Sequence, residues 1–170
     1  FSLGRLGPNK MGEEGAPCIV SSLENKVTKL ESSSKYKTLN LSPCSNFFSY
    51  GTTAGELVVR DTKTNKVILR LPRSSQRILS TTVYQRGNGA VEVAWTNSSG
   101  ILSIYSITDQ SMRLVHRLPR SSEKIQASPD GDFLGLSTFN KLLVFKTDDL
   151  KLLDKFNSAH HQDSICCISF

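Results

Sequence analysis

Residues 37–75 read KTLNLSPCSNFFSYGTTAGELVVRDTKTNKVILRLPRSS, and this stretch decides the fold. It predicts four short strands separated by turns rich in Gly, Pro, Asn, Ser and Thr. Phe47 and Phe48 supply aromatic side chains, which favour a pleated surface. No helical spacing of apolar residues fits the stretch, so strands are predicted over 37–41, 46–51, 56–61 and 66–71.

The same unit recurs along the chain at intervals of about 40 to 45 residues. LSPCSNFF at 41–48 returns as ASPDGDFL at 127–134, and LPRSS occurs at 71–75 and again at 118–122. Four strands per repeat at this period are typical of β-propeller blades. The sequence therefore predicts an all-β fold with blades at about 35–72, 77–118 and 123–157, a partial blade at 17–31 and the start of another at 159–170.

The two ends of the chain carry weaker signals. Residues 1–16 contain Gly4, Gly7, Pro8, Gly12 and Gly15 and no periodic apolar pattern, which predicts a flexible linker or loop. In the later copies, strands are predicted over 78–84, 90–96, 101–106, 113–118, 124–127, 133–138, 141–146 and 151–156, and one more within 159–170. These blades make an incomplete ring, so we expect the remaining blades to come from the same longer chain or from a partner chain.

Composition excludes several classes of protein. No run approaches the roughly 18 apolar residues that a membrane span needs, so no membrane association is expected. The cysteines, Cys18, Cys44, Cys166 and Cys167, show no repeated spacing, which predicts neither a disulfide framework nor a metal site. A reduced protein of the cytoplasm or nucleus is expected. The net charge of +6 gives a mild preference for acidic partners.

Several short motifs resemble the WD-repeat family of β-propellers. HQDSICCISF at 161–170 is similar to that family's loop and first strand, with His161 and Asp163 at the polar positions. Ser128, Pro129, Asp130 and Gly131 resemble its turn between strands one and two. Asp61, in Arg60-Asp61, stands where a Trp-Asp dipeptide often closes strand three.

The resemblance implies a structural role for these loop and turn residues. In that family a loop His, a strand-two Ser or Thr, a turn Asp and a strand-three Trp form one hydrogen-bond network, and no copy here has all four. We therefore expect the blades to be held mainly by apolar packing. The resemblance also implies a non-catalytic scaffold that binds proteins within a larger intracellular assembly.

No constellation of residues predicts catalysis or a cofactor. His160 and His161 lie in one loop with Asp163, but that loop offers no third ligand and no nucleophile with a partner. His116 lies on a predicted strand, and Trp95 is expected to fill the core between blades rather than to stack on a base. No glycine-rich phosphate loop or nucleophile elbow is present. The protein is predicted not to be an enzyme.

One repeated feature suggests a binding surface. The loops that follow each fourth strand carry basic residues interspersed with serines, and equivalent loops of neighbouring blades emerge on one rim. They predict a basic arc formed by Lys35, Lys37, Arg73, Arg77, Arg120 and Lys124. Such an arc can bind acidic peptides, phosphopeptides or a nucleic-acid backbone. The opposing interpretation is that repeated loops are polar because they are solvated, and phosphorylation of the serines would reverse the sign of the arc.

Three functions follow from these observations. The first is the protein-binding scaffold. The second is an RNA-associated assembly factor, of the ribosome-biogenesis type, whose basic loops contact phosphate. The third is a sensor segment of a longer enzyme or ATPase.

Overall fold

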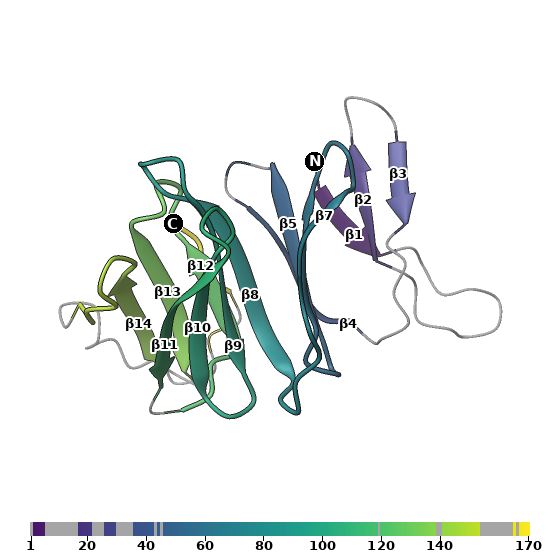
Figure 1. Ribbon diagram of the computed structural model, residues 1–170. Helices are drawn as coiled ribbons and strands as arrows, with labels where there is room; N and C mark the ends of the chain where they lie inside the picture. Colours follow the sequence, from purple (N-terminus) through teal and green to yellow (C-terminus); the bar gives the residue numbers. More distant parts are fainter. Residues whose placement is uncertain are drawn as a thin grey trace.

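The computed structural model describes residues 2–5, 17–21, 26–29, 36–42, 44, 46–118, 120–138, 141–153, 165 and 167–170. Within them, the secondary structure consists of strands and turns, with no helix. The strands form antiparallel sheets that follow one another along the chain and fan out side by side, as Figure 1 shows. The predicted all-β propeller fold is confirmed.

The sequence that decides the fold forms one four-stranded sheet, here called blade 1. Its strand order is the order of the chain, with each strand antiparallel to the last. Each strand lies within one residue of its predicted position. The strands are β4 (Tyr36–Leu41), β5 (Phe47–Thr52), β6 (Leu57–Asp61) and β7 (Val67–Leu71).

The second and third copies form blade 2 and blade 3. Blade 2 repeats the meander, and its innermost strand β8 packs beside β4 and β12, the innermost strands of the neighbouring blades. Blade 2 contains β8 (Ile78–Gln85), β9 (Val91–Asn97), β10 (Ile101–Ser106) and β11 (Ser111–Arg117); blade 3 contains β12 (Lys124–Ala127), β13 (Phe133–Thr138) and β14 (Lys141–Lys146).

The expectation of a loop over residues 1–16 is wrong for Ser2–Arg5. This segment is strand β1, and it pairs with β2 (Pro17–Ser21), which in turn pairs with β3 (Lys26–Lys29). The backbone N–H and C=O groups of this segment form hydrogen bonds with β2. A short sequence interrupted by Gly4 does not reveal this pairing. The rest of the predicted linker lies outside the described residues.

The fourth strand predicted for blade 3, over 151–156, is not formed in the residues that are described there. Only an isolated bridge joins Leu152 to Phe145, supported by the Leu153 N–H that donates to Val144 O at 2.8 Å. The strand predicted near the C-terminus is likewise absent from Ile165 and residues 167–170, which belong to no strand. The end of this segment nevertheless packs on blade 3, because Ile168 and Phe170 lie against Gly135.

Apolar side chains fill the two seams between the blades. One cluster lies between blades 1 and 2 and includes Leu57, Val59, Val93 and Trp95, so the prediction that Trp95 fills the core is confirmed. The other lies between blades 2 and 3 and includes Ile104, Leu134 and Phe145. Burial of these side chains supplies the main stabilisation of the arc.

Candidate functional site

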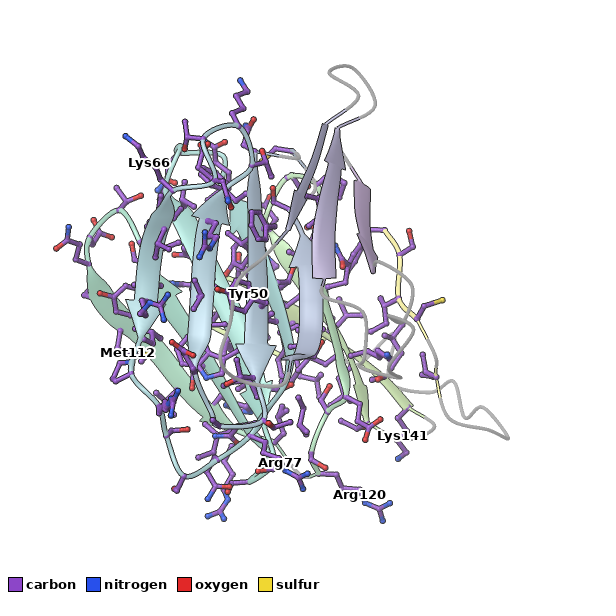
Figure 2. All side chains as sticks on the ribbon, turned by 90° about the vertical axis from the view of Figure 1, so that its right-hand side faces the viewer. Tyr50, Lys66, Arg77, Met112, Arg120 and Lys141 are labelled. Atoms are coloured by element: carbon purple, nitrogen blue, oxygen red, sulfur yellow. The ribbon has the colours of Figure 1, made fainter. Side chains whose placement is uncertain are left out.

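The loops that join one blade to the next lie on a single rim, here called the loop rim. Figure 2 shows Arg77 and Arg120 at one edge of the molecule and Lys66 at the opposite edge. Arg73 and Arg77 lie in the loop between β7 and β8, Arg120 lies in the loop between β11 and β12, and all three are exposed. Lys124, also exposed, is the first residue of β12.

Hydrogen bonds join the loops of this rim to neighbouring turns and strands of the blades. The Ser98 N–H donates to Arg77 O at 3.0 Å, and the Ser98 hydroxyl donates to Gln76 Oε1 at 3.0 Å. In the next loop, the buried Thr96 hydroxyl donates to Ser122 O at 2.7 Å. The basic side chains are therefore carried on backbone that is held in place.

The two copies of LPRSS are not equivalent in register. In the first copy, the Ser74 hydroxyl donates to Gln76 O at 2.9 Å, and Ser74 is exposed. In the second, the following serine takes this place: the Ser122 hydroxyl donates to Lys124 O at 2.9 Å, and Ser122 is fully buried. The pentapeptide repeat thus marks the correct loops, but it is offset by one residue relative to the strands.

Other members of the predicted arc lie elsewhere or are not described. Lys37 lies within strand β4 rather than in a loop, and Lys35 lies outside the described residues. Lys141, which the sequence reasoning missed, lies at the same edge of the molecule as Arg77 and Arg120 in Figure 2. It is the first residue of β14, and the repeat that aligns Gly55, Gly100 and Asn140 in the sequence would have placed it there.

A polar cavity of about 270 Å³ lies among the inner strands β4, β8 and β12. Its lining includes Asn40, Ser80, Glu123, Lys124 and Cys167. The Asn40 amide donates to Gln126 Oε1 at 3.1 Å and so joins blade 1 to blade 3 across it. Since Lys124 belongs both to the cavity and to the loop rim, the cavity lies beside the basic surface.

The predicted turn residues occupy hydrogen-bonded turns. The Ser128 hydroxyl donates to Asp130 Oδ1 and accepts from the Phe133 N–H at 3.0 Å, and this side-chain hydrogen bond from Ser128 is the main cause of a lowered pKa of Asp130. Pro129 is exposed and Gly131 is buried in the same turn. Asp61 accepts from the Thr64 N–H at 2.7 Å, which lowers its pKa. His161 and Asp163 lie outside the described residues.

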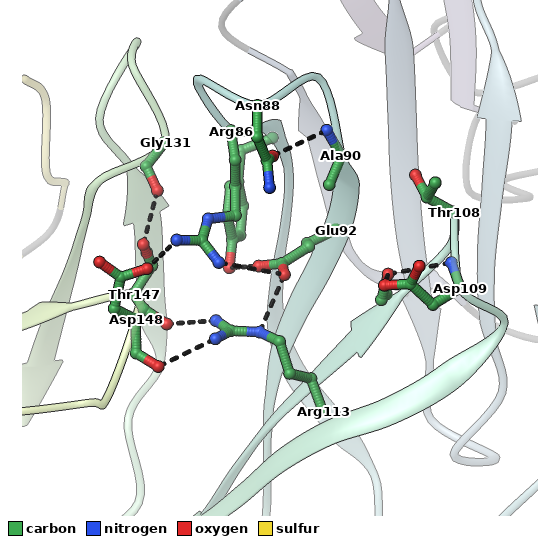
Figure 3. Close-up of polar contacts among 12 residues, drawn as sticks. Arg86, Asn88, Ala90, Glu92, Thr108, Asp109, Arg113, Gly131, Thr147 and Asp148 are labelled. Atoms are coloured by element: carbon green, nitrogen blue, oxygen red, sulfur yellow. Dashed lines mark hydrogen bonds and ion pairs between the residues drawn. The ribbon is translucent and has the colours of Figure 1, made fainter.

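A buried ionic cluster joins blades 2 and 3 in addition to the apolar seam, and the sequence reasoning did not predict it. Figure 3 shows Glu92 of β9 between Arg86 and Arg113, while the guanidinium of Arg113 reaches the carbonyls of Thr147 and Asp148 in blade 3. Glu92 also accepts from the Tyr84 hydroxyl at 2.8 Å. The sequence signal was a lone acidic residue within the apolar run AVEVAW.

The described residues hold no group of three or more His, Cys, Asp or Glu side chains that could bind a metal. His116 lies on β11, and its ring meets that of Phe145 edge-on, with the centroids 5.7 Å apart. Cys44 and Cys167 are free and exposed. Among the described residues there is also no helix long and apolar enough to span a bilayer.

Comparisons with known proteins give matches in structure but none in sequence. No family model matches the chain, and no curated protein is significantly similar in sequence. The structure of U3-55K is similar with a TM-score of 0.64 at 10% identity, over 81% of this chain and 43% of that one. The WD40 repeats of RRP9 are similar with the same TM-score and identity, over 81% of this chain and 42% of that one.

The chain thus spans less than half the length of these two structures. At 10% identity the likeness concerns the fold alone. The order of strands in each sheet, the innermost strands gathered side by side and these two matches agree: this chain folds as blades of a β-propeller, as the WD40 repeats of RRP9 do.

Proposed function

We propose that this chain is a non-catalytic scaffold that binds acidic or phosphorylated segments of other proteins on its loop rim. The observation that carries the proposal is the exposure of Arg73, Arg77, Arg120 and Lys124 on loops that share that rim. Guanidinium groups bind carboxylates and phosphates through paired hydrogen bonds, which makes such a surface selective for those groups.

The blades contribute rigidity to this surface. The turns beneath the loops are hydrogen-bonded to them, as in the bond from the Leu118 N–H to Gly100 O at 2.8 Å. A loop that is already ordered loses less conformational entropy when a partner binds, so less of the interaction energy is spent on ordering it. This arrangement suits a protein whose task is to hold partners rather than to transform them.

A protein partner is favoured over RNA by the composition of the loop rim. Single-stranded nucleic acid is usually held by aromatic side chains on which its bases stack. Loop residues 72–77 and 120–123 and turn residues 52–55 and 97–100 contain no Phe, Tyr or Trp, and the corresponding segment of blade 3, residues 138–141, contains a single one, Phe139. These segments therefore offer charge and hydroxyl groups but no series of aromatic rings for stacking, and the RNA-associated function is the second candidate.

The proposal also includes the setting of the scaffold. Further blades, from the same longer chain or from a partner chain, would complete the ring, which agrees with the 43% coverage of U3-55K. The free thiols of Cys44 and Cys167 are in keeping with a reducing compartment, the cytoplasm or the nucleus.

The test compares charge reversal on the two rims. One variant carries Arg77→Glu, Arg120→Glu and Lys124→Glu, and the matched control carries Lys63→Glu, Lys66→Glu and Lys151→Glu. These three control lysines are exposed. Lys63 and Lys66 lie in the turn between β6 and β7, and Figure 2 shows Lys66 at the edge opposite Arg77 and Arg120. Lys151 lies in the equivalent turn of blade 3, where the Lys146 N–H donates to Lys151 O as the Asp61 N–H donates to Lys66 O. Binding of a glutamate-rich peptide, a phosphoserine peptide and a short RNA is measured by fluorescence anisotropy.

We expect the loop-rim variant to bind both peptides at least tenfold more weakly and the control variant to bind them as the unmodified chain does. Equal binding by both variants would remove the proposal. Preferential binding of RNA, with an affinity that falls steeply with salt and is lost only in the loop-rim variant, would replace it with the RNA-associated function.

A further inference from the structure

The outer strands of blades 1 and 2 expose large apolar side chains. On β11, Met112 is 49% exposed and Val115 is 59% exposed, and on β7 Val67 and Ile68 are exposed as well. Figure 2 shows Met112 at the outer edge of the molecule, away from the inner strands. Exposed apolar residues that gather on edge strands, rather than singly, mark surfaces that bind a partner.

The backbone of β11 has an unpaired edge. In the part of the chain that the structure describes, β11 is the last strand of its sheet and pairs only with β10. The Leu118 N–H donates to Gly100 O, so Leu118 directs its backbone groups toward the neighbouring strand. Alternate residues of an antiparallel strand direct these groups to opposite sides. The N–H and C=O groups of Val115 and Arg117 therefore point away from β10. These groups can form the ladder of an added strand.

The side chains next to that edge border the apolar seam between blades 1 and 2. Met112 is in register with Tyr105 and Val115 with Ser103, and Tyr105 packs against the cluster that fills this seam. Leu69 of β7 packs against the same cluster from blade 1. An added strand on β11 would therefore place alternate side chains beside Met112 and Val115, on the face of blade 2 that borders this cluster.

The charges on these two strands select the partner. β7 and β11 contain Arg70, Arg113, His116 and Arg117 and no acidic residue. Arg70 is paired with Glu56 and Arg113 with Glu92, whereas Arg117 is exposed on the strand edge. Pairing of β11 with β11 of a second copy would bring like charges together, so charge complementarity favours an acidic partner.

We propose that the free edge of β11 binds an extended segment of a partner protein as a fifth strand of blade 2, and that one face of this segment carries apolar β-branched residues followed by an acidic residue, since Met112, Val115 and Arg117 share one face of β11. The backbone groups of Val115 and Arg117 supply the hydrogen bonds, Met112 and Val115 supply apolar contact, and Arg117 selects acidic side chains. This surface is separate from the loop rim and does not depend on the function proposed for it.

The probe for this surface is a capped peptide of about nine residues, long enough to cover one blade strand, with valines and one terminal glutamate on one face and threonines on the other. The matched peptides replace glutamate with lysine, or carry N-methyl groups on alternate amides so that the backbone cannot pair. Binding to the full chain is measured by amide chemical shifts and by hydrogen exchange at Val115 and Arg117. Two variants are compared, Val115→Pro, which removes an outward N–H without removing a bond to β10, and Val115→Thr, which keeps that N–H.

We expect the glutamate peptide to protect the amides of Val115 and Arg117 and to bind at least tenfold more tightly than either matched peptide. Val115→Pro and Arg117→Glu should each weaken binding at least tenfold, while Val115→Thr should weaken it less and the Arg77→Glu, Arg120→Glu pair should leave it unchanged. Unaltered binding by both Val115→Pro and Arg117→Glu would overturn the proposal. So would an absence of protection at both amides, or a chain that pairs with itself through β11 in sedimentation experiments.

Discussion

The Nε atom of Arg113 in β11 lies 2.8 Å from Oε1 of Glu92 in β9, and the Glu92 side chain is only 2% exposed. A second arginine, Arg86, approaches the same oxygen at 3.8 Å. Because Arg113 also donates to the main-chain carbonyl of Asp148 at 3.1 Å and Arg86 pairs with the Asp148 carboxylate, the cluster connects blade 2 to blade 3 through two guanidinium groups.

Replacement of Glu92 by Gln should lower the free energy of unfolding by about 3 kcal/mol, because it removes the buried counter-charge of Arg113 and leaves Arg86 paired only with the exposed Asp148. Urea denaturation measures this as a lower midpoint at unchanged slope. Glu123→Gln is the control, since Glu123 is exposed, and its effect should stay within about 0.5 kcal/mol. A Glu92→Gln midpoint equal to that of the control would show that the cluster does not stabilise the seam.

Tyr84 should make the chain less stable in alkali. Burial, and then the Glu92 carboxylate, raise the pKa of Tyr84 above its ordinary value of 10.0. Above about pH 10 the unfolded chain therefore ionises this tyrosine while the folded chain does not, so the stabilisation present below pH 10 is lost as the pH rises.

The comparison of the unmodified chain with Tyr84→Phe isolates this effect from other groups that titrate in alkali. The variant loses one buried hydrogen bond, worth about 1 kcal/mol, at neutral pH. It should also lose less stability between pH 10 and 11, by up to about 1.4 kcal/mol per pH unit. Parallel stability curves for the two proteins over that range would contradict the prediction.

The blades were predictable from sequence because the repeat and the turn chemistry agree. LSPCSNFF and ASPDGDFL place a serine at the same point, and in both turns that serine N–H donates to the carbonyl of a phenylalanine, Ser42 to Phe47 at 2.8 Å and Ser128 to Phe133 at 2.9 Å. Positive φ angles at Gly55 and Gly100 fall at the two turns that the repeat aligns. Local signals and the long-range period therefore predict the same fold.

The strands that were missed or misplaced depend on pairing rather than on local pattern. Ser2–Arg5 is a strand because β2 lies beside it, and four residues with a central glycine carry no period of their own. Leu152 and Leu153 match the expected fourth strand of blade 3, but only one bridge forms there, next to Leu150, whose φ of 51° turns the backbone out of extended geometry.

The candidate site was predictable in outline but not in register. The repeat of LPRSS identifies the loops, yet a one-residue offset buries Ser122 while its sequence equivalent Ser75 is exposed. The cavity and the Glu92 cluster each join residues of different blades, and no spacing within one strand encodes such a meeting. Only the isolated charge in AVEVAW indicated that a buried partner existed.

Asp130 should titrate below its ordinary pKa of 3.8, because the Ser128 hydroxyl, and then the Asp132 N–H, donate hydrogen bonds to its carboxylate. Any stability that this turn gains from the ionised carboxylate is present above pH 3.8 and is lost as the pH falls through the lowered pKa. NMR titration of the Asp130 carboxyl carbon measures the midpoint. In Ser128→Ala the midpoint should rise toward 3.8, and an unchanged midpoint would mean that the serine does not act on the carboxylate.

Gly131→Ala should destabilise the chain by about 2 kcal/mol, because the glycine has a φ of +75° that an L side chain rarely adopts. An added Cβ would also lie 2.5 Å from Gln85 O, at the end of β8 in the neighbouring blade. Gly87→Ala is the matched control in the facing turn, where a Cβ meets no atom within 4 Å, and its effect should stay within about 0.5 kcal/mol. If urea denaturation gave the same midpoint for both variants, the prediction would be wrong, and the turn that contains Gly131 would not pack closely on β8.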